Sequence, residues 1–332
     1  MRVAAIDCGT NSIRLLIADV DAGSAESGSG RLVDVERRLE IVRLGQGVDR
    51  TGRFAAEALA RTFDACRRYA TLIDSSGAEQ VRFVATSATR DAANREEFMT
   101  GVRDLLGVEP EVISGEEEAR LSFAGATREL AGRGFPTPHL VVDIGGGSTE
   151  FVLGGTGDLP TVAGPQAAIS VDLGCVRLTE RCLPSDPPAD AEIAAARAEV
   201  DRQLDKAGLT VPFEEARTLV GLAGTVTTVA AMALDLSSYD PDRLHHARIP
   251  ATAVHAACAR LLAMDHDERR RLPYMHPGRV DVIGGGSLIL DGIAARVAPF
   301  LDHAEVVVSE HDILDGIAWS CEGPEELIPC AF

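Results

Sequence analysis

The stretch Asp143-Ile144-Gly145-Gly146-Gly147-Ser148-Thr149-Glu150 lies between two short apolar runs. An earlier stretch, Asp7-Cys8-Gly9-Thr10-Asn11-Ser12, lies in the same way between Val3–Ile6 and Ile13–Val20. In both copies an apolar run ends in Asp-x-Gly, a small polar turn follows, and a second apolar run begins. Two such runs joined by a tight polar turn are typical of a β-hairpin. The sequence therefore predicts two copies of one hairpin and an internal duplication of a large unit.

Segments with helical periodicity separate and follow the two hairpins. Apolar residues recur on one helical face from Leu59 to Ile73, and Asn94–Gly107 carries helix start and stop signals. Ser114, with a glutamate three residues later, has the pattern of a capping box. Two more helices are expected around Ile193–Leu204 and Val254–Leu261. Strands that alternate with helices indicate an α/β fold.

Composition and charge bound the function. A chain of 332 residues suggests two domains at roughly 150 residues each. Its net charge of −19 argues against a nonspecific nucleic-acid or anionic-membrane binder. The longest uncharged stretch, Thr218–Leu234, is too short and too polar to cross a bilayer. Seven cysteines without a C-x-x-C pair indicate reduced thiols, so we expect a cytoplasmic protein.

Phosphate binding is the chemistry that the glycine-rich segments indicate. Lys206 is the only lysine and follows no glycine, which excludes a Walker A loop, so phosphates must be bound by arginines and backbone N–H groups. Segments 7–12, 143–149, 221–225 and 284–287 each read as a glycine-rich turn after a strand. An aspartate at such a strand end is well placed to hold Mg²⁺. Ordinary tight turns, with Asx-turns at the aspartates, are the alternative.

A set of motifs in a fixed order makes the prediction specific. The chain resembles the exopolyphosphatase/guanosine pentaphosphate phosphohydrolase family over essentially its whole length, on the motifs Asp7-x-Gly-Thr-Asn-Ser-x-Arg14, Ala85-Thr-Ser-Ala-Thr-Arg90, Ser114-Gly-x-Glu-Glu-Ala-Arg120 and Asp143-Ile-Gly-Gly-Gly-Ser-Thr-Glu150. This family is a branch of the actin-like, sugar-kinase and heat-shock ATPase superfamily. The resemblance implies two α/β, ribonuclease H-like lobes, residues 1–127 and 128–305, with the active site in the cleft between them. Residues 306–332 would form a final helix that returns to the first lobe.

The resemblance also assigns catalytic residues. Glu118 corresponds to the base that activates the attacking water, and Arg90 to a catalytic arginine that binds phosphate. The sequence adds a reason to choose between neighbours, because Glu117 stands three residues after Ser114 and is expected to cap the helix. Glu118 lies about 100° further round that helix and is free to face the cleft. The alternatives are a solvated helix charge for Glu118 and a surface salt bridge for Arg90.

The remaining site residues follow from the same motifs. Asp143, Glu150 and Asp7 are expected to hold Mg²⁺ or another divalent cation. The residues expected to bind phosphate are Gly9, Thr10, Asn11, Ser12, Arg14, Ser87, Gly145, Gly146, Gly147, Ser148, Thr149, Gly224 and Thr225. A histidine zinc site is not expected, because the eight histidines are dispersed and lack the spacing of metal ligands.

The resemblance implies hydrolysis of the terminal phosphoanhydride of inorganic polyphosphate, with release of orthophosphate. Removal of the 5′-phosphate of guanosine pentaphosphate (pppGpp) in the same site is the nearest alternative. A superfamily kinase or ATPase and a non-catalytic alarmone-binding regulator are alternatives of other classes. We expect a homodimer with no nucleic-acid or membrane partner. Longer family members carry extra C-terminal domains, so this chain is expected to be the short, two-lobe form and to favour short polymers.

Overall fold

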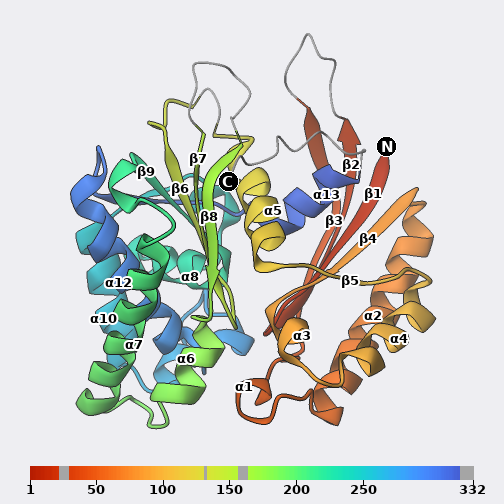
Figure 1. Ribbon diagram of the computed structural model, residues 1–332, viewed down its shortest axis with the longest axis horizontal. Helices are drawn as coiled ribbons and strands as arrows, with labels where there is room; N and C mark the ends of the chain where they lie inside the picture. Colours follow the sequence, from red (N-terminus) through yellow and green to blue (C-terminus); the bar gives the residue numbers. More distant parts are fainter. Residues whose placement is uncertain (22–29, 131–132, 156–163, 322–332) are drawn as a thin grey trace. The chain divides into compact units, whose positions relative to one another are not determined.

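The computed structural model describes residues 1–21, 30–130, 133–155 and 164–321. They form two compact units (Figure 1). The first unit contains Met1–Arg128 and the segment that begins at Ile313, and the second unit contains Glu129–Asp312. The predicted lobe boundary after residue 305 falls inside a strand, β11 (Glu305–Val308). Because β11 pairs with two other strands of the second unit, that unit extends beyond the predicted boundary.

The first unit is built on a five-stranded mixed sheet of order β3-β2-β1-β4-β5. Its strands are β1 (Arg2–Cys8), β2 (Ser12–Asp21), β3 (Arg31–Ile41), β4 (Gln80–Ala85) and β5 (Glu111–Val112). The predicted first hairpin is confirmed, since β1 and β2 pair antiparallel with Asp7 opposite Arg14. Side chains alternate between the two faces of a strand, so Ala4 and Ile6 enter one hydrophobic core and Val3 and Ala5 enter another.

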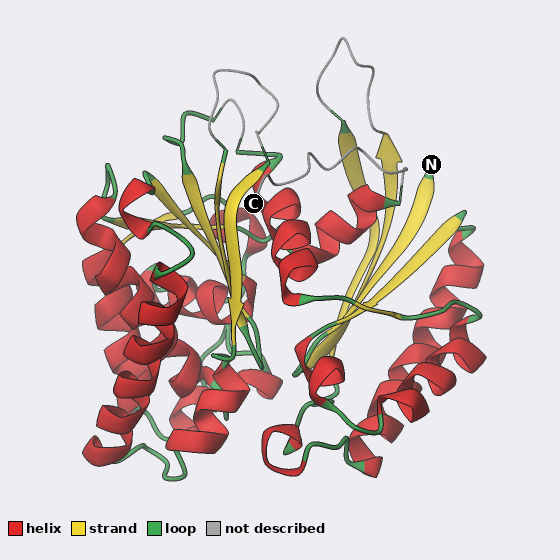
Figure 2. Ribbon diagram, viewed as in Figure 1, coloured by secondary structure: helices red, strands yellow, loops and turns green. Residues whose placement is uncertain are grey.

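Helices cover both faces of the first sheet (Figures 1 and 2). The helices of this unit are α1 (Val48–Thr51), α2 (Ala56–Ser76), α3 (Ser87–Asp91), α4 (Arg95–Leu106), α5 (Gly115–Thr127) and α13 (Ile313–Ser320). Helices α2 and α4 end where predicted, at Gly77 and Gly107, whose φ angles of 70° and 69° lie in the left-handed region that glycine adopts easily. Helix α13 packs on α5 and β1, and Arg37 binds its buried Asp315 at 2.5 Å.

The second unit repeats this plan in a six-stranded sheet of order β10-β11-β9-β6-β7-β8. Its other strands are β6 (His139–Ile144), β7 (Thr149–Gly154), β8 (Pro165–Val171), β9 (Thr218–Leu222) and β10 (Arg248–Pro250). Strands β8-β7-β6-β9-β11 have the same order and directions as β3-β2-β1-β4-β5. The sheets therefore confirm the predicted duplication, and β10 is an addition to the second copy.

Helices of the second unit pack together over one large hydrophobic core. They are α6 (Cys175–Cys182), α7 (Asp190–Gly208), α8 (Ala223–Ala233), α9 (Pro241–Leu244), α10 (Ala251–Ala263), α11 (His266–Arg270) and α12 (Ile283–Val297), with 3₁₀ turns at Phe213–Glu215, Pro277–Arg279 and Ala298–Phe300. The prediction of a strand and turn at 280–287 is wrong, because Gly284–Ser287 forms the first turn of α12. A Cβ on Gly285 would lie 2.8 Å from the Cys175 carbonyl oxygen, so this glycine allows close helix packing.

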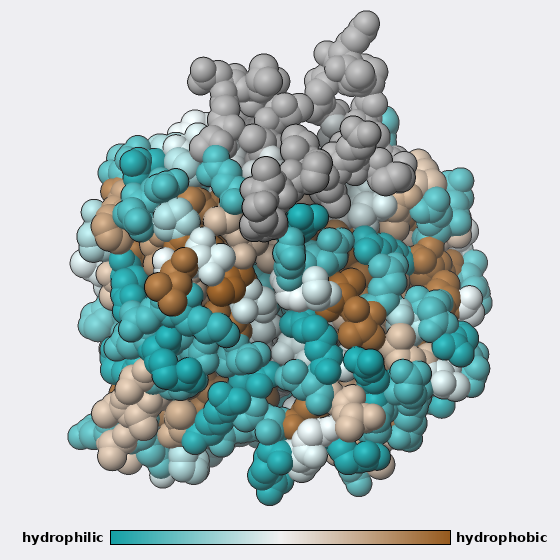
Figure 3. Space-filling view, in the orientation of Figure 1, coloured by the Kyte–Doolittle hydropathy of each residue, from teal (hydrophilic) through white to brown (hydrophobic). Residues whose placement is uncertain are grey.

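Polar side chains cover most of the face in Figure 3, and apolar side chains appear there in small groups. Within the described residues, no helix is long and apolar enough to span a membrane.

Candidate active site

In each unit, the predicted site residues follow the carboxyl ends of neighbouring parallel strands. In the first unit the turn 9–11 follows β1, and Thr86 and Ser87 follow β4. In the second unit the turn 145–148 follows β6, and α8 follows β9. Open α/β sheets bind ligands at this edge, because the loops that leave parallel strands gather there.

The first glycine turn is held from one side by its carbonyl groups. The N–H of Gly9 donates to the Ser12 carbonyl at 2.9 Å and closes the turn. The carbonyls of Thr10 and Asn11 accept N–H groups from residues 42–45. A peptide N–H points away from the carbonyl of the same peptide plane, so the N–H groups that follow these carbonyls are turned away from that loop. Gly45 permits this approach, since a Cβ there would lie 2.3 Å from the Thr10 side chain.

Asp7 and Arg14 form an ion pair on this hairpin. They stand directly opposite one another, and the Asp7 carboxylate accepts Nη2–H of Arg14 at 2.6 Å and Nε–H at 3.0 Å. The side chain of Asp7 is 7% exposed, and that of Arg14 is 17% exposed. Asp7 was expected to bind a cation and Arg14 a phosphate. In the structure each of these two side chains meets the charge of the other, and both roles stay predictions.

Glu118 and Arg90 lie together in the first unit. Arg90 donates one Nη1–H to Glu118 Oε2 at 2.7 Å and the other to the Ile113 carbonyl at 3.0 Å. Burial raises the pKa of the Glu118 carboxyl, whereas the Arg90 guanidinium and a hydrogen bond from Thr86 lower it, and the nearby Asp7 charge raises it. Glu118 is therefore not a solvated helix charge, since only 8% of this residue is exposed.

The other donors of Arg90 remain available for a ligand. Both hydrogens of Nη1 are used within the protein, but Nε–H and the Nη2 hydrogens donate no hydrogen bond to any residue that the structure describes. A guanidinium edge with two parallel N–H groups matches two oxygens of a phosphate. The Arg90 side chain is 25% exposed, so this edge is accessible. Ser87, also expected to bind phosphate, is buried at the start of α3.

Glu117 differs from its neighbour as predicted, but it does not cap the helix. The Ser114 hydroxyl oxygen accepts the Glu117 N–H at 3.1 Å, which confirms Ser114 as the N-cap. The Glu117 carboxylate lies 3.9 Å from the Arg82 guanidinium instead of reaching back to the Ser114 backbone. The predicted capping box is thus half formed, because an arginine on a neighbouring strand attracts the second carboxylate.

The second glycine turn is held in the same way as the first. The N–H of Gly145 donates to the Ser148 carbonyl at 3.0 Å. The carbonyls of Gly145 and Gly146 accept N–H groups from the first turn of α6, and that of Gly147 accepts Nε–H of Arg177 at 2.7 Å. The N–H groups of Gly146, Gly147 and Ser148 therefore point away from α6. They donate no hydrogen bond within the described part of the chain, so they can bind an anion.

Thr149 and Gly174 position this turn further. The Thr149 hydroxyl donates to the Leu173 carbonyl and is fully buried, so Thr149 anchors the strand rather than offering its hydroxyl to a ligand. A Cβ on Gly174 would lie 2.3 Å from the Gly146 carbonyl group. Only glycine at 174 lets the start of α6 come close enough to hold the turn.

Asp143 and Glu150 are the residues of the second hairpin that correspond to Asp7 and Arg14. They stand directly opposite one another across β6 and β7, and both are buried. Directly opposed residues project from the same face of a sheet, with Cβ atoms about 4.5–5.5 Å apart. The Ser170 hydroxyl donates to Glu150 at 2.7 Å. Carboxylate oxygens are the ligands that Mg²⁺ prefers. The pair therefore fits a divalent cation.

The start of α8 offers a further anion site in the second unit. Strand β9 passes directly into α8, so Gly224 and Thr225 lie in the first helical turn rather than in the predicted separate turn. Within the described residues no side chain caps this helix end, and its positive dipole end favours an anion. Ala223 has a φ of 66°, which costs an alanine roughly 1–3 kcal/mol and marks a position held by its surroundings.

Arg279 was not among the predicted site residues. Its guanidinium lies against Gly224, where a Cβ would be 2.3 Å from Arg279 Cζ, and its Nη1 lies 3.4 Å from the Thr228 hydroxyl. The sequence offered one signal, the glycine-rich segment 221–225, but nothing in the spacing related residue 279 to residue 224. Arg279 brings a positive charge to the helix end that was expected to bind phosphate.

Comparisons with known proteins agree with this geometry. The sequence profile of the Ppx/GppA phosphatase family matches residues 16–320. The protein named Exopolyphosphatase 2 of Mycobacterium tuberculosis is 53% identical over 327 residues, which cover 97% of this chain and 99% of that protein.

Two solved structures are also similar. The crystal structure of an exopolyphosphatase-like protein has a TM-score of 0.89 at 46% identity and covers 97% of this chain and 98% of its own. The structure of the Aquifex aeolicus PPX-GPPA enzyme has a TM-score of 0.75 at 32% identity and covers 96% of this chain and 99% of its own. These likenesses confirm the predicted actin-like α/β fold. With hairpins, motifs and family profile in agreement, the chain belongs to the Ppx/GppA phosphatase family.

Proposed function

We propose that this protein hydrolyses the terminal phosphoanhydride of inorganic polyphosphate and releases orthophosphate. The observation that carries the proposal is the buried Glu118 carboxylate, which Arg90 contacts at 2.7 Å at the start of α5. The relative that is 53% identical bears the name exopolyphosphatase, which supports polyphosphate as the substrate. A carboxylate placed beside a phosphate-binding arginine suits attack by water better than transfer to an acceptor alcohol.

Glu118 has the properties of a general base. Burial raises the pKa of its carboxyl toward the range in which a base is efficient near neutral pH. Arg90 opposes this rise, because its positive charge and its hydrogen bond lower the pKa of the Glu118 carboxyl. In the proposed reaction Glu118 orients a water molecule and takes its proton, while the free N–H groups of Arg90 bind oxygens of the terminal phosphate. The N–H groups of the glycine turns bind further phosphate oxygens.

Asp143 and Glu150 are the residues that would hold a divalent cation, and we propose Mg²⁺. When bound, Mg²⁺ neutralises charge on the phosphate oxygens and so favours attack by a water molecule. The ion pair of Asp7 with Arg14 makes Asp7 a weaker candidate for this role. Asp7 instead acts on Glu118, because its charge raises the pKa of that carboxyl.

The test is phosphate release from polyphosphate and from pppGpp, measured side by side with and without Mg²⁺. We expect Mg²⁺-dependent release, faster from polyphosphate than from pppGpp, and release from both that is about 10²–10⁴-fold slower with the Glu118→Gln protein. Preference for pppGpp would replace the proposed substrate but keep the site. Equal release by Glu118→Gln would overturn the proposed mechanism.

Short polymers are the substrates we expect this protein to favour. Its 51 acidic residues against 32 basic ones repel the distal part of a long polyanion. Long chains then gain little extra binding and dissociate between cuts. Gel electrophoresis of a long-chain digest at partial conversion should show a ladder of trimmed products. Only full-length polymer and free phosphate would mean processive cleavage and would contradict this preference.

A homodimer and a cytoplasmic location remain predictions from the sequence. Sedimentation velocity would distinguish a monomer from a dimer. Fractionation of cells of the source organism would test the location.

A further inference from the structure

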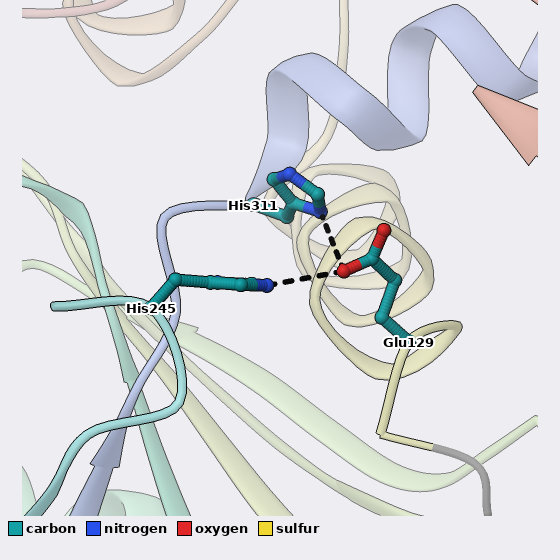
Figure 4. Close-up of side chains that lie close together, drawn as sticks. All are labelled: Glu129, His245 and His311. Atoms are coloured by element: carbon teal, nitrogen blue, oxygen red, sulfur yellow. Dashed lines mark hydrogen bonds and ion pairs between the residues drawn. The ribbon is translucent and has the colours of Figure 1, made fainter. Parts of the chain in front are cut away.

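Three ionisable side chains that the proposed reaction does not use meet in the second unit: Glu129, His245 and His311 (Figure 4). One ligand atom from each lies within 4.8 Å of the others. His245 Nε2 is 3.0 Å from Glu129 Oε2, and His311 Nδ1 is 3.5 Å from the same oxygen. The sequence separates these residues widely, which is why the spacing of the histidines predicted no metal site.

We propose that Glu129, His245 and His311 bind a zinc ion or a similar transition-metal ion. Two imidazoles and one carboxylate are a donor set that zinc accepts, with a water molecule as the fourth ligand. Tetrahedral zinc bonds of about 2.0–2.2 Å place ligand atoms about 3.3 Å apart. The two measured separations, 3.0 and 3.5 Å, lie on either side of that value. Mg²⁺ is a poor competitor here, because it prefers oxygen ligands.

The backbone holds the two histidines in place before any ion binds. The N–H of His246 donates to the Val308 carbonyl at 2.7 Å, which joins the histidine segment to the end of β11. The Ser309 hydroxyl donates to the His311 carbonyl at 2.7 Å and accepts the His311 N–H at 3.1 Å. The ring of His245 lies 3.6 Å from that of His246 and 4.6 Å from that of His311. Little rearrangement is then needed to bring the two rings onto one ion.

The cluster is accessible and has a suitable charge. The side chains of His245, His311 and Glu129 are 20%, 29% and 45% exposed, so an ion can reach them from solvent. Two neutral imidazoles and one carboxylate give a net charge of −1 toward a divalent ion.

One hydrogen bond sets a limit on the affinity. His245 Nδ1 accepts the Glu310 N–H at 3.2 Å, so in the neutral ring the proton sits on Nε2 and points to Glu129. An ion at Nε2 displaces that proton to Nδ1, and the Glu310 hydrogen bond is lost. Metal-binding histidines ordinarily donate their second N–H to an acceptor. We therefore expect weaker binding than at a structural zinc site.

A bound ion would connect the two ends of the second unit. Glu129 is the first residue of this unit, and His311 is the last but one. An ion held by both joins its beginning to its end, and because the site exists only in the folded unit, binding stabilises the folded state. The bound form should therefore unfold at a higher temperature.

The experiment is a titration of the full-length protein with Zn²⁺ in excess Mg²⁺, followed by competition with a chromophoric chelator. We expect one equivalent to bind to the wild type and to His303→Ala, whose histidine is exposed in the loop before β11. His311→Ala and Glu129→Gln should each weaken binding at least about 10–100-fold, the range seen even for the loss of outer-shell partners. His311→Ala should also abolish the rise in Tm caused by Zn²⁺.

Co²⁺ provides an independent readout, because a tetrahedral site with imidazole ligands gives intense visible absorption. We expect that spectrum in the wild type and in His303→Ala, and its loss in His311→Ala. Two results would overturn the proposal. One is the absence of a saturable Zn²⁺ equivalent in the wild type, which would leave the cluster as hydrogen bonds only. The other is unchanged Zn²⁺ affinity in a folded His311→Ala protein.

Discussion

The two glycine hairpins have the same backbone hydrogen bond across the turn and differ in the charge of the residue opposite the aspartate. In each, the glycine that follows Asp-x closes the turn with an N–H bond to a serine carbonyl, at 2.9 Å in the first and 3.0 Å in the second. In each, the aspartate stands directly opposite the residue seven positions later. That residue is Arg14 in the first hairpin and Glu150 in the second. The first hairpin is therefore internally neutralised, whereas the second places two carboxylates face to face.

We infer from this difference that the turn and the cross-strand pair have separate functions. Both turns have their carbonyls tied on one side, by residues 42–45 in the first unit and by α6 in the second. Both can thus present N–H groups to phosphate oxygens. The cross-strand pair then decides what accompanies the phosphate. Asp7 contributes to the electrostatics around Glu118, and we propose that Asp143 and Glu150 supply oxygen ligands to a cation.

The largest effect on activity should come from substitution of Glu118, whose pKa is influenced by Asp7 of the first hairpin. Glu118→Gln removes the base but keeps the shape, so kcat for phosphate release should fall about 10²–10⁴-fold with polyphosphate binding nearly unchanged. Glu117→Gln is the matched control, because the Glu117 carboxylate has only a long, partly exposed contact with Arg82, at 3.9 Å, and stands outside the proposed reaction. Loss of activity in Glu117→Gln with retention in Glu118→Gln would reverse the assignment of the pair.

The second effect concerns the carboxylate pair of the second hairpin. Asp143→Asn or Glu150→Gln should raise the Mg²⁺ concentration needed for half-maximal activity about 10–100-fold, since each removes one charged ligand. Glu150→Arg, which gives the second hairpin the pairing of the first, should abolish Mg²⁺ activation. If dialysis against EDTA left the wild-type rate unchanged, the reaction would not need a divalent cation.

The pH dependence tests how Arg90 acts on Glu118. A base works only when it is deprotonated, so kcat/KM should be full above the pKa of Glu118 and fall as pH drops through it. Arg90 lowers that pKa, so Arg90→Met should move the acidic limb of the pH profile to higher pH as well as weaken substrate binding. Compared with Arg90→Met, Arg90→Lys should bring the acidic limb of the pH profile most of the way back to its wild-type position, but it should restore less of the substrate binding. An unshifted limb in Arg90→Met would mean that Glu118 is not the titrating group.

A smaller effect is expected at the glycines that hold the turns. Gly174→Ala forces a Cβ to within 2.3 Å of the Gly146 carbonyl, and Gly45→Ala forces one to within 2.3 Å of the Thr10 side chain. Overpacking of this kind typically costs about 1–3 kcal/mol of stability. Gly174→Ala meets backbone and should also raise KM, whereas Gly45→Ala meets a threonine methyl that can move. Urea unfolding and KM for both variants check the difference.

Much of the secondary structure could be predicted from the sequence, because it depends on local patterns. The two hairpins, the glycine ends of α2 and α4, and Ser114 as an N-cap follow from residues close together in the chain. The prediction of a strand and turn at 280–287 was wrong for a physical reason. A short apolar run before glycines fits a strand end and a helix start equally well. Its glycines are needed where α12 packs on other helices, which no local pattern reveals.

Contacts between distant residues could not be predicted. The packing of Arg279 on Gly224 and the cluster of Glu129 with His245 and His311 both join residues that are far apart in the sequence. The role of Arg14 also needed the register of β1 and β2, which places it opposite Asp7. Composition and spacing carry no information on such pairs until the topology is known.

The most direct test of the division between the hairpins is Mn²⁺ binding without substrate, followed by the EPR signal of the free ion. We expect Asp143→Asn and Glu150→Gln to weaken Mn²⁺ binding at least about tenfold. Asp7→Asn, at the matching position of the first hairpin, should leave the affinity within about threefold of the wild type, because Arg14 already meets that charge. Equal weakening by Asp7→Asn and Glu150→Gln would contradict the account, since the two hairpins would then share one task.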